Sequence, residues 1–86
     1  MLKEFLEDEV MYQEFYDGIF DFIVSGKIRN GEYEGNLHVI KKMDLENFII
    51  YVEHEIDGKR EIHRTPSIRK NKLLRLVNRH AKKQGY

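Results

Sequence analysis

The spacing of apolar residues predicts a helix at each end of the chain. Between Leu2 and about Ser25, apolar and aromatic side chains recur every three or four residues, which is typical of a helix that buries one face. Acidic residues gather on the opposite side of the same helix. Gly18 offers a point at which this helix could kink or divide, because glycine is a weak helix former. Residues 1–25 are therefore expected to form an acidic amphipathic helix.

The middle of the chain has the pattern of an antiparallel sheet. Residues 26–36 hold three Gly and two Asn, which predicts a long loop with a short extended piece around Glu32 to Glu34. The runs LHVIKKM (37–43) and FIIYVEHEI (48–56) are rich in β-branched and aromatic residues and are joined by a short polar connection. They predict an antiparallel pair, and a third strand completes a sheet over residues 37–64.

Asp57 and Gly58 predict the turn before the third strand, because both residues tolerate a positive φ. A two-residue turn here pairs Ile56 with Lys59, Glu55 with Arg60, His54 with Glu61 and Glu53 with Ile62. The opposite charges of Glu55 and Arg60 favour this register. Alternation then predicts a core face with Phe48, Ile50, Val52 and Ile56. The wet face is expected to hold Lys42, Glu53, Glu55, Arg60 and Arg64.

The segment 65–84 has the pattern of a second amphipathic helix. Thr65 is suited to cap its N-terminus, and Pro66 is suited to its first position, where a missing N–H costs nothing. The helix is expected to run to about Lys83 and to end before Gly85. The whole pattern predicts a single α+β domain over residues 1–86, in the order α-β-β-β-α. Its core would be a three-stranded antiparallel meander with two helices packed on one face.

Composition narrows the functional classes. At 86 residues without cysteine, the chain rests on an apolar core, and a deep active-site cavity is not expected. Its N-terminus is acidic where a signal peptide would be basic, and no apolar run approaches the length of a membrane span. We therefore expect a cytoplasmic protein with no membrane partner.

Charge is distributed unevenly although the chain has no net charge. Residues 1–25 carry seven acids and one base, and residues 26–58 carry seven acids and four bases. Residues 59–86 carry ten bases and one acid. The electrostatic field of this uneven charge distribution can steer a polyanion toward the basic end of the chain. The same distribution equally favours pairing of charges within one chain or a homo-oligomer formed through opposite charges.

Bases form a stripe on the predicted last helix, opposite its apolar side, and Lys59 and Arg60 at the hairpin extend the set. The stripe consists of Arg69, Lys72, Arg75, Arg79, Lys82 and Lys83. No acid lies between Ile62 and Tyr86, so the helix forgoes stabilising i,i+4 ion pairs. Each phosphate that such a stripe neutralises releases counterions. The leading hypothesis is a nucleic-acid-binding protein, for RNA before DNA. The alternative is a solvated surface whose charge is offset by acids elsewhere in the chain.

The element order and the run SIRKNK (67–72) resemble the double-stranded RNA-binding domain in outline. In that family a Lys-rich cluster at the start of the second helix contacts phosphates across a groove, which the resemblance implies for this run. The family's Gly-Pro-x-His loop is absent, with KKMDLEN in its place, and the long loop at 26–36 is foreign to it. The preference for RNA rests on this resemblance.

The sequence gives only weak indications of a catalytic site or a metal site. His54, Glu61 and His63 share one face of the predicted hairpin and form a conceivable zinc set, but any two-stranded ribbon with these residues would show the same spacing. His38 and His80 are expected to be structural. The chain has no Gly-rich phosphate loop and no ordered nucleophile, base and acid. We expect no enzyme activity, no metal and no cofactor.

The first helix suggests a second class of function. It carries more aromatic residues than one docking face requires, with Tyr12 and Phe15 as candidates for a protein interface. In size and style the chain is similar to the small inhibitor and adaptor proteins of phages and mobile elements. The alternative is that these aromatic side chains fill a thin core.

Overall fold

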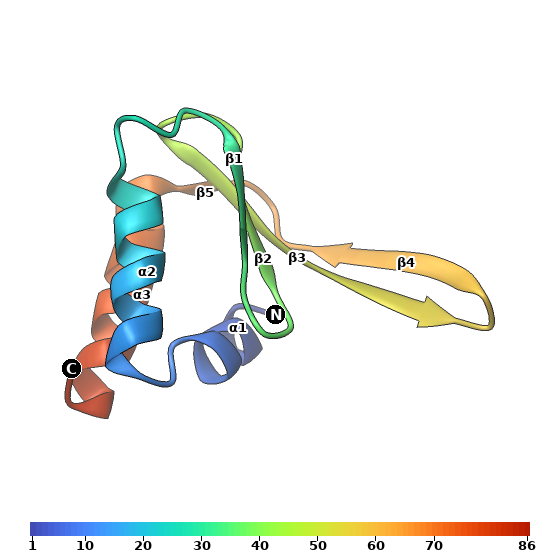
Figure 1. Ribbon diagram of the computed structural model, residues 1–86, viewed down its shortest axis with the longest axis horizontal. Coiled ribbons are helices and arrows are strands. Elements are labelled where there is room, and N and C mark those ends of the chain that lie inside the picture. Colours follow the sequence, from blue (N-terminus) through green and yellow to red (C-terminus); the bar gives the residue numbers. More distant parts are fainter.

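Two antiparallel helices lie on one face of a β-sheet, and a long hairpin projects from the far side of the molecule (Figure 1). The computed structural model describes all residues, 1–86. Its helices are α1 (Leu2–Glu9), α2 (Gln13–Val24) and α3 (Lys70–Gln84). Its strands are β1 (Gly31–Glu34), β2 (Val39–Lys42), β3 (Asn47–Ile56), β4 (Lys59–Arg64) and β5 (Ile68–Arg69). The α+β class and the packing of helices on one face are confirmed.

The sheet is an antiparallel meander in the order β1-β2-β3-β4, and the short β5 pairs with the beginning of β3. The predicted hairpin register is confirmed: Ile56 lies opposite Lys59 and Glu55 opposite Arg60. Asp57 and Gly58 both have positive φ, 52° and 77°, as the two-residue turn requires. Local turn chemistry and alternation together therefore specified this hairpin.

The core lies between the sheet and the two long helices. Alternate residues of β2 and β3, including Ile40, Phe48 and Ile50, are almost completely buried there. They meet Ile19 and Ile23 of α2 and the buried side of α3, formed by Leu73, Val77 and Ala81. These helical residues are spaced four positions apart in the sequence, so they line up on one face of each helix, and that face packs against the sheet.

The first predicted helix is two helices, and the break is not at Gly18. The chain turns at Met11 and Tyr12, between α1 and α2. Val10, the last residue before the turn, is fully buried and anchors the end of α1 in the core. Gly18 stays inside α2 for a different reason. A Cβ there would lie 2.7 Å from the hydroxyl oxygen of Tyr33, so glycine allows this close approach.

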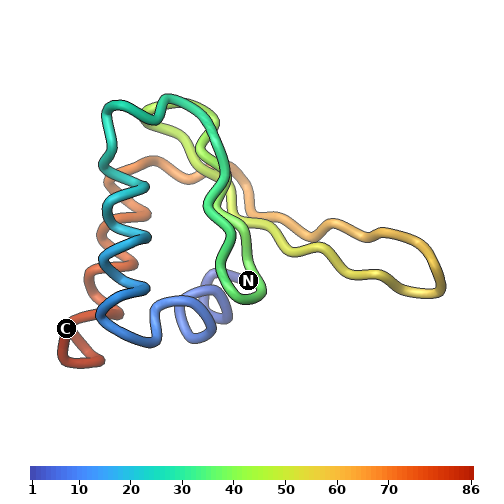
Figure 2. The backbone as a smooth tube through the Cα atoms, in the orientation of Figure 1, coloured from blue at the N-terminus to red at the C-terminus, as the bar shows by residue number.

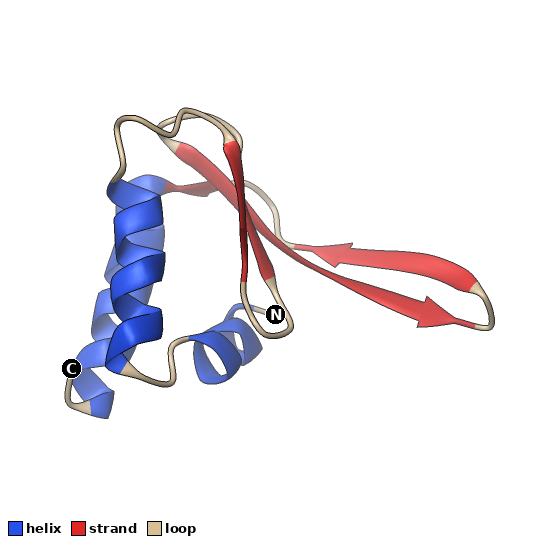
Figure 3. Cartoon of the chain, viewed as in Figure 1, coloured by secondary structure: helices blue, strands red, loops and turns tan.

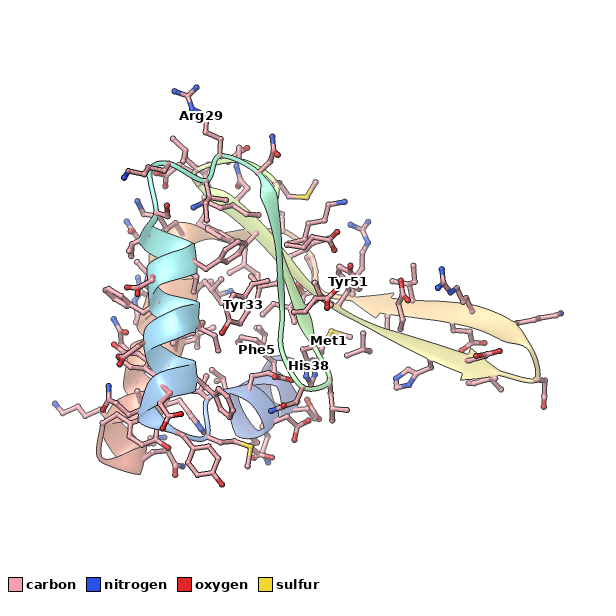
Figure 4. The ribbon with its side chains drawn as sticks, viewed as in Figure 1. Met1, Phe5, Arg29, Tyr33, His38 and Tyr51 are labelled. Atoms are coloured by element: carbon pink, nitrogen blue, oxygen red, sulfur yellow. The ribbon has the colours of Figure 1, made fainter.

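The end of α1 is tied to the turn between β1 and β2 by a buried carboxylate. Glu9 is 3% exposed and accepts hydrogen bonds from the backbone N–H groups of Leu37 and His38, both at 2.9 Å. Its Oε2 also lies 3.0 Å from Nδ1 of His38, whose ring packs edge-on against Phe5 (Figure 4). Gly35 admits this carboxylate, because a Cβ there would collide with it.

Part of the predicted loop at 26–36 is the strand β1. The expected extended piece at Glu32 to Glu34 therefore belongs to the sheet and pairs with β2. Tyr33 points inward and its ring lies 5.6 Å from that of Phe22 (Figure 4). Glu32 and Glu34 point to solvent, as the alternation of a strand requires.

The last helix begins later than predicted. Residues 65–69 are extended, and α3 begins at Lys70 after Arg69, so Thr65 does not cap it and Pro66 is not its first residue. Thr65 is buried instead, and its Oγ1 accepts a hydrogen bond from the N–H of Ile50 at 3.0 Å. Pairing of Ile68 with Phe48 outweighs the local helix signal. The predicted end is confirmed, because Gly85 ends the helix with a φ of 91°.

Two assignments to the faces of the sheet are wrong. Ile56 was expected in the core but is 51% exposed, because the outer half of β3 extends beyond the helices. Lys42 was expected on the wet face but is 1% exposed. Its Nζ donates to the backbone carbonyls of Phe22, Ile23 and Ser25 at 3.0, 3.3 and 2.7 Å, at the C-terminus of α2.

The Lys42 ammonium sits where the helix dipole is negative, which compensates for its burial. Burial lowers the pKa of Lys42 below its ordinary value, and the charge of Lys70 lowers it further. The rings of Phe22 and Phe48 lie 5.7 and 5.5 Å from Nζ. The remaining wet-face assignments, Glu53, Glu55, Arg60 and Arg64, are exposed as expected.

Candidate nucleic-acid interface

The bases of α3 lie on its outer side. The buried line of Leu73, Val77 and Ala81 faces the core, and all the bases of the predicted stripe are exposed. By the period of 100° per residue, Lys72, Arg75, Arg79, Lys82 and Lys83 fall within about 100° centred opposite that line. Arg69 is the residue before the helix and extends the row at its beginning. The six bases run along α3, which is about 22 Å long.

None of the six stripe residues forms an ion pair within 4.0 Å. The base of α3 that does so is Lys70, whose Nζ lies 3.8 Å from a carboxylate oxygen of Glu46. The acidic helix α2 runs beside α3, but the polar contact between them joins neutral groups: the Tyr16 hydroxyl donates to Oδ1 of Asn78 at 2.7 Å. The charges of the stripe are therefore not neutralised by direct contact with the acids of the same chain.

A basic hollow lies at the beginning of the stripe. It has a volume of about 490 Å³ and is open to solvent. Lys3 of α1, Arg64 at the end of β4 and Lys72 of α3 contribute to its walls, and Ser67 adds a hydroxyl. Sequence reasoning missed Lys3 and assigned Arg64 only to a wet sheet face. No local signal links Lys3 with the other two residues, because the fold alone brings the beginning of α1 close to the end of β4 and the start of α3.

The bases of the hairpin are separate from the stripe. Lys59 and Arg60 follow the hairpin turn at the beginning of β4, and this turn lies at the opposite end of the molecule from α3 (Figure 2). The longest dimension of the molecule, 39 Å, runs in this direction. Lys59 and Arg60 therefore do not extend the stripe within one copy, contrary to the expectation from sequence.

The aromatic candidates lie at the break between α1 and α2. Tyr12 is 57% exposed and its neighbour Met11 is 43% exposed, whereas Phe15 is half-buried. The rings of Tyr12 and Phe15 lie 5.6 Å apart. Tyr12 is thus exposed to solvent and can contact a partner, whereas Phe15 is only partly accessible.

The four histidines differ in burial: His38 is buried, His80 is half-buried, and His54 and His63 are exposed. His54 and His63 share one face of the hairpin with ring centroids 5.7 Å apart, and Nε2 of His63 lies 3.4 Å from Oε2 of Glu61. No set of three or more His, Cys, Asp or Glu side chains is arranged to hold a metal ion. His38 is structural, as expected, because its contact with Glu9 is buried.

Two further polar contacts shape the exposed sheet. The hydroxyl of Tyr51 hydrogen-bonds to the carboxylate of Glu32, which raises the pKa of Tyr51 to about 12. The backbone N–H of Glu46 and the side chain of Asn47 lower the pKa of Asp44 in the turn before β3, and the charge of Arg69 contributes. These contacts order side chains on the exposed side of the sheet.

Comparison with known proteins does not assign the chain to a family. No protein-family model, curated protein or solved structure matches the chain. The outline shared with the double-stranded RNA-binding domain is also weakened, because residues 68–69 belong to β5 and only Lys70 to Lys72 of the basic run lie on α3. No helix in the structure is both long enough and apolar enough to cross a bilayer.

Proposed function

We propose that the protein binds the phosphate backbone of a nucleic acid, RNA before DNA, through the outer side of α3. The observation that carries the proposal is the stripe of six exposed bases, none of which is in an ion pair with the protein's own acids. Bases that are unpaired in the free protein can contact phosphates without first breaking an internal ion pair. Non-enzymatic backbone binding of this kind is weakly sequence-specific.

The basic hollow supports the same proposal. Lys3 and Arg64 add positive charge beside Lys72, so a strand that follows α3 meets further phosphate-binding groups at its beginning. Successive turns of α3 present bases about 5 Å apart along the axis, which gives a row of contacts rather than a single point. The preference for RNA rests only on the outline shared with the double-stranded RNA-binding domain, so RNA and DNA must be compared under the same conditions.

The first test is a titration of labelled duplex RNA, single-stranded RNA and duplex DNA at several salt concentrations, followed by fluorescence anisotropy. We expect log Kobs to fall linearly with log salt, with a slope of about −0.7 to −0.9 per phosphate contacted. The double variant R75E/R79E should bind at least about tenfold more weakly, with an unchanged circular dichroism spectrum, because both side chains are exposed.

The matched control is K27E/R29E, which changes the net charge equally at exposed positions of the loop between α2 and β1. It should retain binding apart from a small long-range effect. Absence of binding to all three probes at low salt, or equal losses in the two double variants, would contradict the proposal. Equal affinity for RNA and DNA would remove the preference for RNA.

A second candidate is a protein-binding inhibitor or adaptor, as in the small proteins of phages. It is supported by the exposed Met11 and Tyr12 at the α1–α2 break. Large apolar side chains that remain in solvent beside acids are typical of protein interfaces. The variant Y12A/F15A should then lose a protein partner while the chain stays folded, and a partner retained by this variant would argue against it.

A further inference from the structure

The outer part of the β3–β4 hairpin has no second layer. Every residue from 53 to 64 is exposed, and we call this segment the arm (Figure 3). Its two large apolar side chains, Ile56 and Ile62, are 51% and 59% exposed. A two-stranded hairpin alone is marginally stable in water, because it buries little apolar surface. A partner that covers one face would remove this deficit.

The two faces of the arm carry different side chains. The cross-strand pairs His54 with Glu61 and Ile56 with Lys59 lie on one face. Alternation along β3 places this face on the same side as the buried Phe48, so we call it the inner face. The outer face carries Glu55 opposite Arg60, and Ile62.

A groove of about 550 Å³ lies under the base of the arm. Its walls come from α1, from the β1–β2 turn and from the inner face of the arm's base, and Figure 4 shows Met1 and His38 close to the point where the arm begins. Its lining residues include Met1, Glu4, Asp8, Leu37 and Val52. Leu37 is 66% exposed, so the groove offers uncovered apolar surface beside carboxylates.

The tip of the inner face is complementary to this groove. Ile56 and Lys59 place an apolar side chain next to a base, whereas the groove places Leu37 and Val52 next to acids. Of the acids of α1, Glu4 is paired with the N-terminal ammonium at 2.9 Å, and Asp8 has no ion pair. The tip cannot enter its own groove, because Ile56 and Val52 lie about 13 Å apart along one strand.

We propose that two copies of this chain exchange arms, each placing Ile56 and Lys59 in the groove of the other. The register makes this contact reciprocal. Three cross-strand pairs lie on the inner face: Val52 with His63 where the arm begins, His54 with Glu61 in the middle, and Ile56 with Lys59 at the tip. If two copies are related by a two-fold axis through the middle pair, the tip of each arm lies over the beginning of the arm of the other copy. Such an interface uses one patch twice and closes as a dimer.

The first experiment is sedimentation velocity of the full chain over a wide range of concentration. We expect a monomer–dimer equilibrium that I56D weakens, with an increase in the dimer Kd of about tenfold or more. The matched control is I62D, which places the same charge on the outer face at a more exposed isoleucine. It should leave the dimer Kd unchanged, and circular dichroism should show that both variants are folded.

A charge exchange tests the pairing itself. K59E and D8K should each weaken the dimer by about tenfold, because each brings like charges together at both symmetric contacts. The double variant K59E/D8K should restore it, since both contacts then regain opposite charges. Neither residue belongs to the α3 stripe, so failure here leaves the nucleic-acid proposal untouched.

Three results would overturn the proposal. One is a monomer at every concentration, and another is a dimer that I56D and K59E leave intact. The third is a dimer that I62D weakens as strongly as I56D. If K59E instead weakened the binding of duplex RNA by a chain that stays monomeric, the arm would be a nucleic-acid contact and not a dimer contact.

Discussion

The two halves of β3 follow the same alternation but have opposite environments. At its beginning Phe48 and Ile50 are completely buried, whereas Ile56 at its end is 51% exposed although it belongs to the same face. The first half lies under α2 and α3 and between β2 and β5, and the second half has only β4 beside it. A strand pattern thus predicts which side chains share a face, and burial is decided by how far the helices reach.

The largest expected difference between the two halves concerns stability. F48A should lower the free energy of unfolding by about 3–5 kcal/mol, because it leaves a cavity in the core. I62A in the arm should change it by less than about 0.5 kcal/mol, because that side chain is exposed and lies away from the groove. Urea unfolding at low protein concentration measures both. Similar losses would show that the arm belongs to the cooperative core.

A second comparison concerns the two pairs of Glu and His. E9Q should cost about 1–3 kcal/mol at neutral pH, because the buried Glu9 carboxylate accepts several N–H groups of the β1–β2 turn. The corresponding E61Q should cost less than about 0.5 kcal/mol, since the Glu61–His63 pair in the arm is exposed. Urea unfolding of the two variants against the wild type provides the measurement.

The same pair predicts a pH dependence. Burial by itself would raise the pKa of Glu9, but the hydrogen bonds from Leu37, Asn36 and His38 outweigh it and hold the pKa below 4.5. The ionised carboxylate therefore stabilises the fold fully above pH 4.5, and this contribution is lost as the pH falls through the lower folded pKa. The difference between wild type and E9Q should shrink over that range. If the difference in unfolding free energy between wild type and E9Q did not change with pH, Glu9 would not be the ionised group that stabilises the fold.

A third comparison, with a smaller expected loss than F48A or E9Q, concerns Thr65 at the boundary between the helix-covered part of the sheet and the arm. β4 and β5 leave a gap beside Ile50, where Thr65 accepts the Ile50 N–H through Oγ1 and donates its own N–H to the Ile50 carbonyl at 2.9 Å. T65V should cost about 1 kcal/mol, because the Ile50 N–H loses its acceptor. T65S keeps the hydroxyl and serves as the control in thermal unfolding. A larger loss in T65S than in T65V would show that the methyl group matters more than the hydrogen bond.

Local chemistry explains the features that could be predicted from the sequence. The turn at Asp57 and Gly58 sets the hairpin register, and Gly85 ends α3, because both depend on backbone conformations that few residues accept. The basic side of α3 was also predictable, since the helical period and the apolar line determine which residues point outward. These features involve residues close together in the chain.

Contacts between distant segments decided the rest. Lys42 has the alternation of a wet-face residue and is buried because the C-terminus of α2 ends above it and supplies carbonyl acceptors. Thr65 and Pro66 have a helix-start pattern that pairing of Ile68 with β3 overrides. The groove, the basic hollow and the exposure of the arm depend likewise on where α1 and the long helices lie. The sequence by itself determined the register of the β3–β4 hairpin and the two sides of α3 through short-range backbone preferences. Only the tertiary structure decided which faces are covered, because coverage depends on packing between segments far apart in the chain.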